Sequence, residues 1–542
     1  MTQIASALIF LATAFVNIRR LCPTVFNDDS PETVAAALAL GITHPPGDPL
    51  LVLLGRLACA FPLGSPAFRL NLLSAIVFAL VPVLVWLALR QWLGHRGRFC
   101  AALAAVALVA GCPVVTQQAA VAKGAAYGLN LCLLAGMTWA ASAGRPMNSW
   151  LFAGTLAAHH WMTLAAYALC PAVAWAARAP RGWRPSGRNA ALAALAFLAA
   201  ASALIAQPIL DARVPAFATG GARTVTRFAA QITRRPFLAT ELRPELHPVG
   251  RQVRPVAAAL HLEVGWPGWI LVAGAFAWSG SPGILAAAAG AAVLLPVLES
   301  LFYLSLPPGL DHLFNVFLLP SAVALAAIAA LGAGAVADRW RLAGLVAAVA
   351  LAAWAGPGRA PARRPYDVRA ATWSFDLARG MFAPLPRGAG LVVVSDLDTF
   401  PLWHAQVVDG FRDDVAVVNW VLLRHPWYRE HVARLLALPA LTTAPDRRAA
   451  YGAVLAGVRR PWFTCAAPLE GTPAGTRLNP FHLGYRLGGG PSGASSGPRG
   501  FAWRGYFEAA ARLPEAHAEL SVGYMNELMG TLARGTQAAP RL

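Results

Sequence analysis

Residues 26–47 read FNDDSPETVAAALALGITHPPG and decide how the start of the chain folds. Ser30 followed by Pro31 predicts a helix start, because Ser caps free backbone N–H groups and Pro loses no hydrogen bond at the first helical position. The apolar run that follows continues the helix until the Pro-Pro-Gly sequence, which interrupts helical hydrogen bonding. Asp29 is therefore expected just outside this helix, and Glu32 in its first turn.

The acidic pair Asp29 and Glu32 has two interpretations. Carboxylates at the start of a helix are ordinary, because the positive end of the helix dipole stabilises them. A carboxylate held beside hydrocarbon is costly, however, and such residues are more often functional. The membrane character of the chain therefore raises the weight of a functional role.

The composition is that of a polytopic membrane protein. Of the 542 residues, 57% are hydrophobic and only 13% are charged, and the mean hydropathy is +0.53. Soluble proteins contain about 25% charged residues. Apolar stretches of membrane-spanning length, with shorter ones allowed inside a bundle, predict about eleven transmembrane helices. The predicted crossings are residues 3–21, 69–91, 99–112, 128–143, 148–162, 164–178, 188–209, 266–281, 283–303, 314–333 and 341–356.

Basic residues predict the orientation in the membrane. The formal net charge is +19 and comes almost entirely from arginine, which basic loops of a membrane protein explain without a nucleic-acid partner. Cytoplasmic loops are enriched in such residues. The predicted cytoplasmic group is Arg90, Arg96, Arg98, Arg145, Arg178, Arg181, Arg184, Arg188, Arg339 and Arg341. This orientation places the first outer loop, 22–68, the outer segment 210–265 and everything after residue 356 outside the cytoplasm, with a bacterial inner membrane as the predicted location.

A change of composition marks a second domain. Residues 356–365 are rich in Pro, Gly and Arg, so we expect a transmembrane domain over 1–356 and a soluble extracytoplasmic α/β domain over 357–542. Residues 390–395 and 415–419 read as buried strands with a helical connection between them, which predicts a parallel α/β unit.

Two carboxylates follow the first of these strands. Asp396 and Asp398 form an Asp-x-Asp sequence, which is compatible with a divalent metal but is more often used for helix capping. The seven cysteines are scattered, without metal-ligand spacing or a disulfide framework. We therefore predict no metal site, and a divalent metal remains an unsupported alternative.

Several blocks of the chain, in order, resemble the protein O-mannosyltransferase-like membrane family. The blocks are residues 29–32, 40–47, 53–57, 69–74, 396–403, 412–419 and 426–428, with Tyr127, Leu129, Asn130, His159, His160 and 233–235 between them. The resemblance extends to about residue 435. It implies a glycosyltransferase of the GT-C class, which takes a sugar from a polyprenyl-phosphate carrier and transfers it outside the cytoplasm.

The resemblance also implies roles for particular residues. Asp29 is the expected base that takes a proton from the acceptor hydroxyl, and Glu32 is expected to orient the acceptor or Asp29. Guanidinium groups match phosphate oxygens, so Arg234 and Arg235 are candidates for the phosphate of the leaving group. The remaining predicted substrate-binding residues are His44, Tyr127, Asn130, His159 and His160. For each of these histidines and arginines, a structural role is an open alternative.

The expected function is transfer of a hexose, with mannose as the candidate sugar, from a polyprenyl phosphate to a hydroxyl acceptor such as protein Ser or Thr. The expected partners are membrane lipid, the polyprenyl-phosphate sugar, and a protein or glycan acceptor. The sequence departs from the family in the stretch from Ala122 to Tyr127, where an expected acidic residue is missing and Lys123 is present. This departure predicts a different substrate, weak activity or no activity. The alternatives are a transporter or flippase of a lipid-linked saccharide, and a catalytically silent membrane scaffold.

Overall fold

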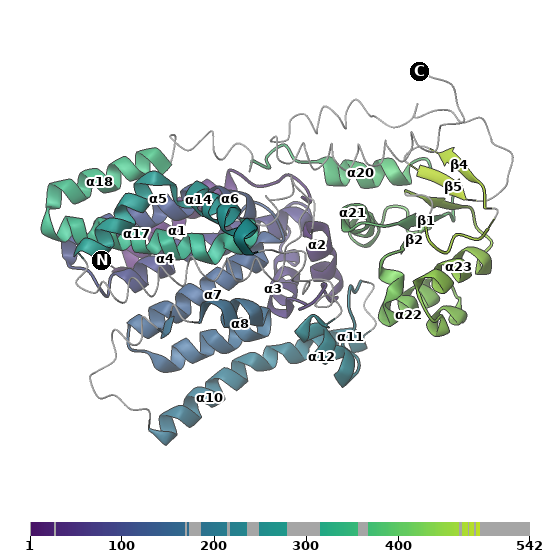
Figure 1. Ribbon diagram of the computed structural model, residues 1–542, viewed down its shortest axis with the longest axis horizontal. Helices are drawn as coiled ribbons and strands as arrows, with labels where there is room; N and C mark the ends of the chain where they lie inside the picture. Colours follow the sequence, from purple (N-terminus) through teal and green to yellow (C-terminus); the bar gives the residue numbers. More distant parts are fainter. Residues whose placement is uncertain are drawn as a thin grey trace, which may run out of the picture.

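The structure, a computed structural model, has a helical bundle at one end and an α/β domain at the other, with helices α2 and α3 between them (Figure 1). It describes residues 2–26, 29–168, 171–172, 186–213, 217–235, 249–278, 315–355, 367–465, 469–474, 476–481 and 484–487. The predicted domain boundary at 356/357, the predicted crossing 283–303, and Arg178, Arg181 and Arg184 lie outside these residues.

The helical part is built from long apolar helices that pack side by side. Its elements are α1 (Thr2–Ile18), α2 (Ser30–Ala39), α3 (Pro49–Cys59), α4 (Pro66–Leu89), α5 (His95–Gly111), α6 (Pro113–Gln118), α7 (Gly124–Ser142), α8 (Pro146–Tyr167), α10 (Gly187–Ala201), η1 (Ser202–Ile205), α11 (Ala206–Ala212), α12 (Val225–Thr233), α14 (Val249–Trp278), η3 (Asn315–Leu318), α17 (Leu319–Arg339) and α18 (Arg341–Ala353). Helix α4 packs on α7, and α17 packs on both α5 and α14.

Four of the described helical segments are long and apolar enough to cross a membrane: Pro66–Leu89, Gly187–Ala212, Val256–Trp278 and Val316–Arg339. Thr2–Ile18, Pro49–Cys59 and Arg341–Ala353 are shorter apolar helices. Large apolar side chains on α1 and α10 are exposed, among them Leu8, Leu11 and Leu195. Exposed apolar surface of this kind fits contact with lipid. The chain is a membrane protein, although these four segments fall short of the eleven predicted crossings.

The predicted pair of crossings around Thr163 needs a shift of its boundary. Within α8, two helical stretches meet at a kink at His160, where φ is −153° and ψ is 83°, and the second stretch runs through Thr163 to Tyr167. The break therefore lies three residues before Thr163, and most of the predicted crossing 164–178 lies outside the described residues. The predicted outer segment 210–265 also contains regular structure, because α12 and the first half of α14 fall within it.

Both predicted ends of the first outer helix need correction. Asp29 occupies the N-cap position of α2, and the hydroxyl of Ser30 instead accepts a hydrogen bond from the backbone N–H of Lys123, at 3.3 Å. The helix ends before the Pro-Pro-Gly sequence, because Leu40 adopts a left-handed conformation with φ 50° and Gly41 N–H bonds back to Ala36. This C-cap releases the chain early and leaves a loop of several residues before α3.

The second part of the chain forms a mixed sheet with helices around it. Its elements are α20 (Trp373–Phe382), β1 (Gly390–Val393), α21 (Asp396–Val407), β2 (Ala416–Asn419), η6 (Leu422–Arg424), α22 (Pro426–Leu435), η7 (Pro439–Thr443), α23 (Arg447–Gly457), β3 (Trp462–Thr464), β4 (Leu478–Phe481) and β5 (Gly484–Leu487). The strand order is β2-β1-β3-β5-β4. Strand β1 is parallel to β2 and β3, and β5 is antiparallel to β3 and β4. The predicted strand–helix–strand unit is therefore confirmed.

The α/β domain packs directly on the first outer loop. Helix α2 packs on α21, and one hydrophobic core contains Phe26 and Ala36 together with Phe400 and Leu402. The rings of Phe217 and Trp403 meet edge to face, with their centroids 5.7 Å apart. This contact places the start of α21 beside Asp29.

Candidate active site

Glu32 is the buried anchor of the loop that follows α2. Its side chain is fully buried and accepts hydrogen bonds from the backbone N–H of His44 at 2.7 Å and from the His44 ring Nδ1 at 2.6 Å. The hydroxyl of Thr219 donates to the same carboxylate. Glu32 therefore positions His44, and the loop of residues 40–48 folds back over α2 around it.

A glycine makes this arrangement possible. Gly41 lies against the backbone of residue 217, and a Cβ at position 41 would come within 2.0 Å of the Phe217 carbonyl oxygen. The close approach lets Ile42 pair with Ala218 and accept a hydrogen bond from Thr219 N–H, at 2.9 Å. Two segments far apart in the sequence are thus held together at the site.

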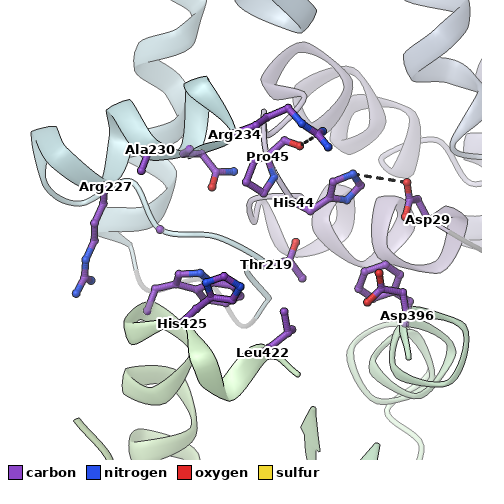
Figure 2. Close-up of a pocket in the computed structure, with 14 residues that line it drawn as sticks. Asp29, His44, Pro45, Thr219, Arg227, Ala230, Arg234, Asp396, Leu422 and His425 are labelled. Atoms are coloured by element: carbon purple, nitrogen blue, oxygen red, sulfur yellow. Dashed lines mark hydrogen bonds and ion pairs between the residues drawn. The ribbon is translucent and has the colours of Figure 1, made fainter. Parts of the chain in front are cut away.

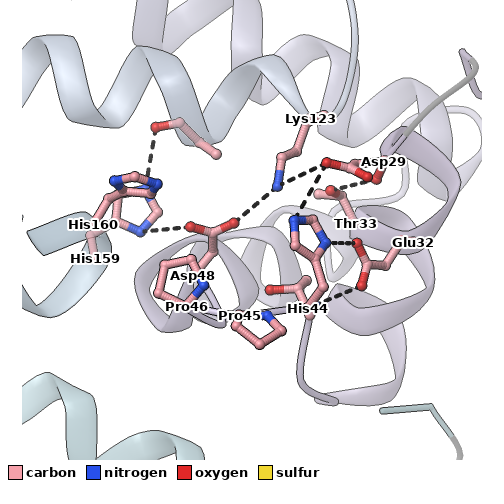
Figure 3. A network of polar contacts seen from close by, with 12 residues as sticks. Asp29, Glu32, Thr33, His44, Pro45, Pro46, Asp48, Lys123, His159 and His160 are labelled. Atoms are coloured by element: carbon pink, nitrogen blue, oxygen red, sulfur yellow. Dashed lines mark hydrogen bonds and ion pairs between the residues drawn. The ribbon is translucent and has the colours of Figure 1, made fainter. Parts of the chain in front are cut away.

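His44 lies between the two carboxylates that the sequence singles out. Its Nδ1 bonds to Glu32, and its Nε2 is 3.6 Å from Oδ2 of Asp29 (Figure 3). Burial alone would lower the pKa of His44, but the carboxylates of Glu32 and Asp29 outweigh it and raise the pKa to about 9. His44 is therefore an imidazolium at neutral pH, with one N–H directed at each carboxylate.

Asp29 makes no capping hydrogen bond with its side chain, although it occupies the N-cap position of α2. Its carboxylate instead faces two cations, with Oδ2 3.6 Å from His44 Nε2 and 3.5 Å from Lys123 Nζ. The side chain keeps 18% of its exposure and lines a cavity. The capping interpretation of Asp29 therefore fails in this structure, and the carboxylate is available to a ligand.

A line of charged and ionisable groups continues from Asp29 into the bundle. Lys123 Nζ lies 3.1 Å from Oδ2 of Asp48, and Oδ1 of Asp48 lies 3.8 Å from Nδ1 of His159 (Figure 3). Burial opposes the charge on Lys123, but Asp48 and Asp29 more than compensate and raise its pKa. Burial likewise opposes the charge on Asp48, whose pKa Lys123 nevertheless lowers. Lys123 is therefore a buried ammonium shared by two carboxylates.

The other predicted substrate-binding residues lie either next to the series Asp29, Lys123, Asp48 and His159 or away from it. Tyr127 lies beside Lys123, with Nζ 6.0 Å from the ring centroid, and His160 bonds to Thr163 at 3.1 Å on the bent helix α8. Asn130 is buried on α7. Arg234 donates to the Pro45 carbonyl oxygen at 2.6 Å and lines the cavity, whereas Arg235 is exposed and does not line it.

The cavity beside Asp29 has a volume of about 260 Å³. One wall comes from the helical part and the other from the α/β domain (Figure 2). The first wall consists of Asp29, His44, Pro45, Thr219, Gly221, Arg227, Ala230, Gln231 and Arg234, and the second of Asp396, Phe400, Leu422, His425 and Trp427. The walls are joined by an ion pair between Arg227 on α12 and Glu430 on α22.

The two carboxylates of the Asp-x-Asp sequence separate in the structure. Asp398 is buried, accepts from Ser395 N–H at 2.9 Å and completes a capping box with the Ser395 side chain. Asp396 is on the cavity side, with its side chain exposed there. The capping hypothesis thus describes Asp398, and the two side chains do not converge on one metal.

A different trio has the atoms that a metal ion would need. Ligand atoms of Asp29, Glu32 and His44 lie within 4.8 Å of one another. The fit is poor, because Glu32 already accepts a hydrogen bond from His44 Nδ1 at 2.6 Å, and the Lys123 ammonium already faces Asp29. The arrangement satisfies these carboxylates with protein N–H groups.

Sequence reasoning missed three members of the site. Asp48 follows the Pro-Pro-Gly sequence directly, and its φ of 33° turns the chain into α3. Lys123 is noticeable in the sequence only as a departure from the family, and Thr219 comes from a distant loop. The one available signal was a lone lysine in an arginine-rich chain, placed before an apolar helix, where an unpaired ammonium would be costly.

Two family models match the chain. Residues 29–174 match the protein O-mannosyl-transferase TMEM260 N-terminal domain, and residues 374–437 match TMEM260-associated domain 2. A curated relative, protein O-mannosyl-transferase TMEM260 of Mus musculus, is 37% identical over 99 residues, which are 18% of this chain and 14% of the mouse protein. Both matched regions contribute residues to the cavity.

Solved structures give a more distant likeness. The apo oligosaccharyltransferase of Archaeoglobus fulgidus has a TM-score of 0.43 at 14% identity, covering 80% of this chain and 68% of that one. The complex of that enzyme with Zn and sulfate has a TM-score of 0.41 at 13% identity, and the match covers 79% of this chain and 66% of that one. The two domain matches and the mouse relative confirm the resemblance predicted from the sequence: residues 29–174 and 374–437 are similar to domains of protein O-mannosyl-transferase TMEM260, and the aligned stretch spans a small part of the mouse protein.

Proposed function

We propose that this protein is an integral membrane glycosyltransferase of the GT-C class. It transfers a hexose, with mannose as the first candidate, from a polyprenyl phosphate to a hydroxyl group such as that of a protein Ser or Thr. The observation that carries the proposal is the position of Asp29. Its carboxylate lies between an accessible cavity on one side and a buried line of charged and ionisable groups on the other.

The reaction needs a base at the acceptor. As the acceptor oxygen forms a bond to the anomeric carbon, the bond from that carbon to the phosphate oxygen breaks and the hydroxyl loses its proton. Asp29 takes this proton, since a carboxylate within hydrogen-bond reach is sufficient for the role. His44 and Lys123, each within 4 Å of Asp29 Oδ2, hold the carboxylate in place. Glu32 acts one step further away, by fixing His44.

The leaving phosphate needs fixed positive charge. Arg234 lines the cavity close to the loop of His44, whereas Arg235 does not, so the geometry favours Arg234 of the predicted pair. Lys123 and the histidines of α8 lie on the bundle side of Asp29, which a lipid-linked donor reaches from the membrane. We therefore place the donor phosphate at Arg234, whose charge acts on the cavity and also on His160 of α8, with the lipid on the bundle side and the acceptor in the rest of the cavity.

The basic loops support the orientation that we propose. The loop after α4 meets the end of α17, where Asp338 accepts from Gly94 and Gly97 N–H, each at 2.8 Å. Arg90, Arg98 and Arg339 therefore lie at one end of the bundle, as expected for loops on a common, cytoplasmic side. The site then faces the opposite side, which is the periplasm if the protein lies in a bacterial inner membrane.

A transfer assay tests the proposal. The purified protein in detergent is given labelled polyprenyl-phosphate mannose or glucose together with membrane proteins as acceptors. We expect label that is bound to protein and released by alkaline β-elimination, as an O-linked sugar is. Absence of product with every donor would contradict the proposal. Movement of the labelled lipid between leaflets of a liposome, without transfer, would instead favour the flippase hypothesis.

A further inference from the structure

The interdomain cavity contains a carboxyl group that the transfer mechanism does not yet use. Asp396 is the first residue of α21, and its side chain is exposed to the cavity. The capping of α21 is already provided by Ser395 and Asp398. Asp396 is therefore not required to begin its helix, and it lies where a ligand can contact it.

Asp396 shares one end of the cavity with Asp29 and His44, while Arg227 and His425 lie toward the other end (Figure 2). Asp29 occupies the N-cap position of α2 and His44 lies in the loop that follows α2, whereas Asp396 belongs to the α/β domain. A substrate in the cavity thus contacts both parts of the chain at the point where Asp29 acts.

The cavity has the chemistry of a site for a polar chain with some apolar surface. Gln231, Arg227 and Asp396 line it with polar groups, of which the Arg227 guanidinium is paired with Glu430 and the Gln231 amide nitrogen donates to the Thr43 carbonyl oxygen. Phe400 and Leu422 provide apolar surface. The rings of His425 and Trp427 stack with their planes 16° apart and their centroids at 6.1 Å, and they form a flat wall. A polypeptide has this combination of backbone amides and side chains.

We propose that Asp396 positions the acceptor, by donating a hydrogen bond to a backbone carbonyl oxygen of the hydroxyl-bearing polypeptide segment in the cavity. The inference rests on the proposed glycosyltransferase function, which already supplies the polypeptide acceptor, and it adds one residue to the acceptor side of that function. Asp396 is a positioning residue here, and Asp29 remains the base.

The electrostatics around Asp396 support a donating carboxyl. The Asp396 carboxyl is open to the cavity but has protein on its other sides, and this partial loss of solvent is the first cause that raises its pKa to about 7. The charge of Asp29 is the second, with Glu32 and Asp398 adding to the effect and His44 opposing it. A carboxyl group with such a pKa is substantially protonated near neutral pH and can donate a hydrogen bond.

The experiment separates acceptor binding from donor chemistry. Full-length protein in detergent is given labelled polyprenyl-phosphate mannose and a pool of short Ser/Thr-rich peptides, and two products are measured: mannosyl peptide and free mannose released by water. The variants are Asp396→Ala, Asp396→Asn and the matched control Asp413→Asn, which changes an exposed residue outside the cavity. The apparent melting temperature of each variant reports its folding.

We expect Asp396→Ala to raise the KM for peptide about 2- to 13-fold, as loss of one hydrogen bond worth about 0.5–1.5 kcal/mol does. Release of free mannose, which involves no peptide, falls less than formation of mannosyl peptide at a peptide concentration below KM. Asp396→Asn keeps a neutral donor, so its KM stays near the wild-type value measured below pH 7. Above pH 7 the wild-type KM rises as Asp396 ionises, whereas that of Asp396→Asn does not.

Three results would overturn the inference. An equal fall in mannosyl peptide and free mannose with Asp396→Ala, at unchanged peptide KM, would assign Asp396 to the donor. A loss of peptide affinity in Asp396→Asn equal to that in Asp396→Ala would show that the ionised carboxylate is needed. Wild-type kinetics in Asp396→Ala would remove the residue from the site. If the wild type makes neither product, the proposed function itself fails, which distinguishes the two failures.

Discussion

The ammonium of Lys123 lies 3.5 Å from the carboxylate of Asp29 and joins it to Asp48, 3.1 Å away on the other side. Lys123 belongs to the stretch where the sequence departs from the family by lacking an acidic residue. The structure explains what this departure does: it places one positive charge in the site, where the two carboxylates share it. Lys123 is thus part of the site that holds Asp29.

Removal of this ammonium is expected to leave two carboxylates without their shared partner. We predict that Lys123→Met lowers the apparent melting temperature and reduces transfer at least tenfold, because breaking a buried ion pair costs about 3–5 kcal/mol. Adding Asp48→Asn to Lys123→Met is expected to restore part of the thermal stability, since it removes one of the stranded charges. Thermal unfolding in detergent measures both effects.

The matched control is Arg213→Met, which removes a cation from an exposed position. Its melting temperature is expected to stay near that of the wild type. Equal melting temperatures for Lys123→Met and the wild type would show that the ion pairs contribute no stability.

The raised pKa of His44 leads us to predict that the protein loses stability at alkaline pH. Its pKa in the folded protein, about 9, lies above the ordinary value of 6.5 because of Glu32 and Asp29. The stabilisation that protonated His44 gains from the two carboxylates is therefore fully present below pH 6.5 and is lost as the pH rises through about 9. We expect the apparent melting temperature to fall across this range, and the fall to be smaller in His44→Gln.

His95→Gln is the matched control, because His95 is exposed at the start of α5. It should follow the wild-type pH dependence. A His44→Gln variant that loses stability with pH as steeply as the wild type would contradict the assignment.

Metal removal is expected to have no effect on transfer. The carboxylates of Asp29 and Glu32 face N–H groups of His44 and Lys123, which supply the positive charge that a divalent ion would otherwise supply. The rate of transfer is compared before and after dialysis against EDTA. A loss that Mg²⁺ or Mn²⁺ restores would show that the trio of Asp29, Glu32 and His44 binds a metal during catalysis.

Local patterns predicted much of the fold. The alternation of buried strand, helix and strand around Asp396 was enough to predict the parallel pairing of β1 and β2, because short parallel units have few topological alternatives. Membrane character followed from composition. The early end of α2 at Leu40 was not predictable, since a left-handed C-cap at a leucine has no strong sequence signal.

The site itself depends on contacts between distant segments. Asp29 and His44 were found from a local motif, but Asp48 and Thr219 join them only after the loop folds over Glu32. Asp396 reaches the cavity because α21 packs on α2, and nothing in either segment alone indicates that contact. Sequence reasoning therefore found the motif at the candidate site, but not the residues that hold it in place.

The most direct test of the proposed role of Asp29 is mannosyl transfer by Asp29→Asn, compared with the wild type and with the control Asp413→Asn. The substitution keeps the shape of the side chain and removes the base. With an unchanged apparent melting temperature, we predict that transfer falls by a factor of roughly 10² to 10⁴, the range typical of a lost general base. Transfer by Asp29→Asn at the wild-type rate would contradict the assignment of Asp29 as the catalytic base.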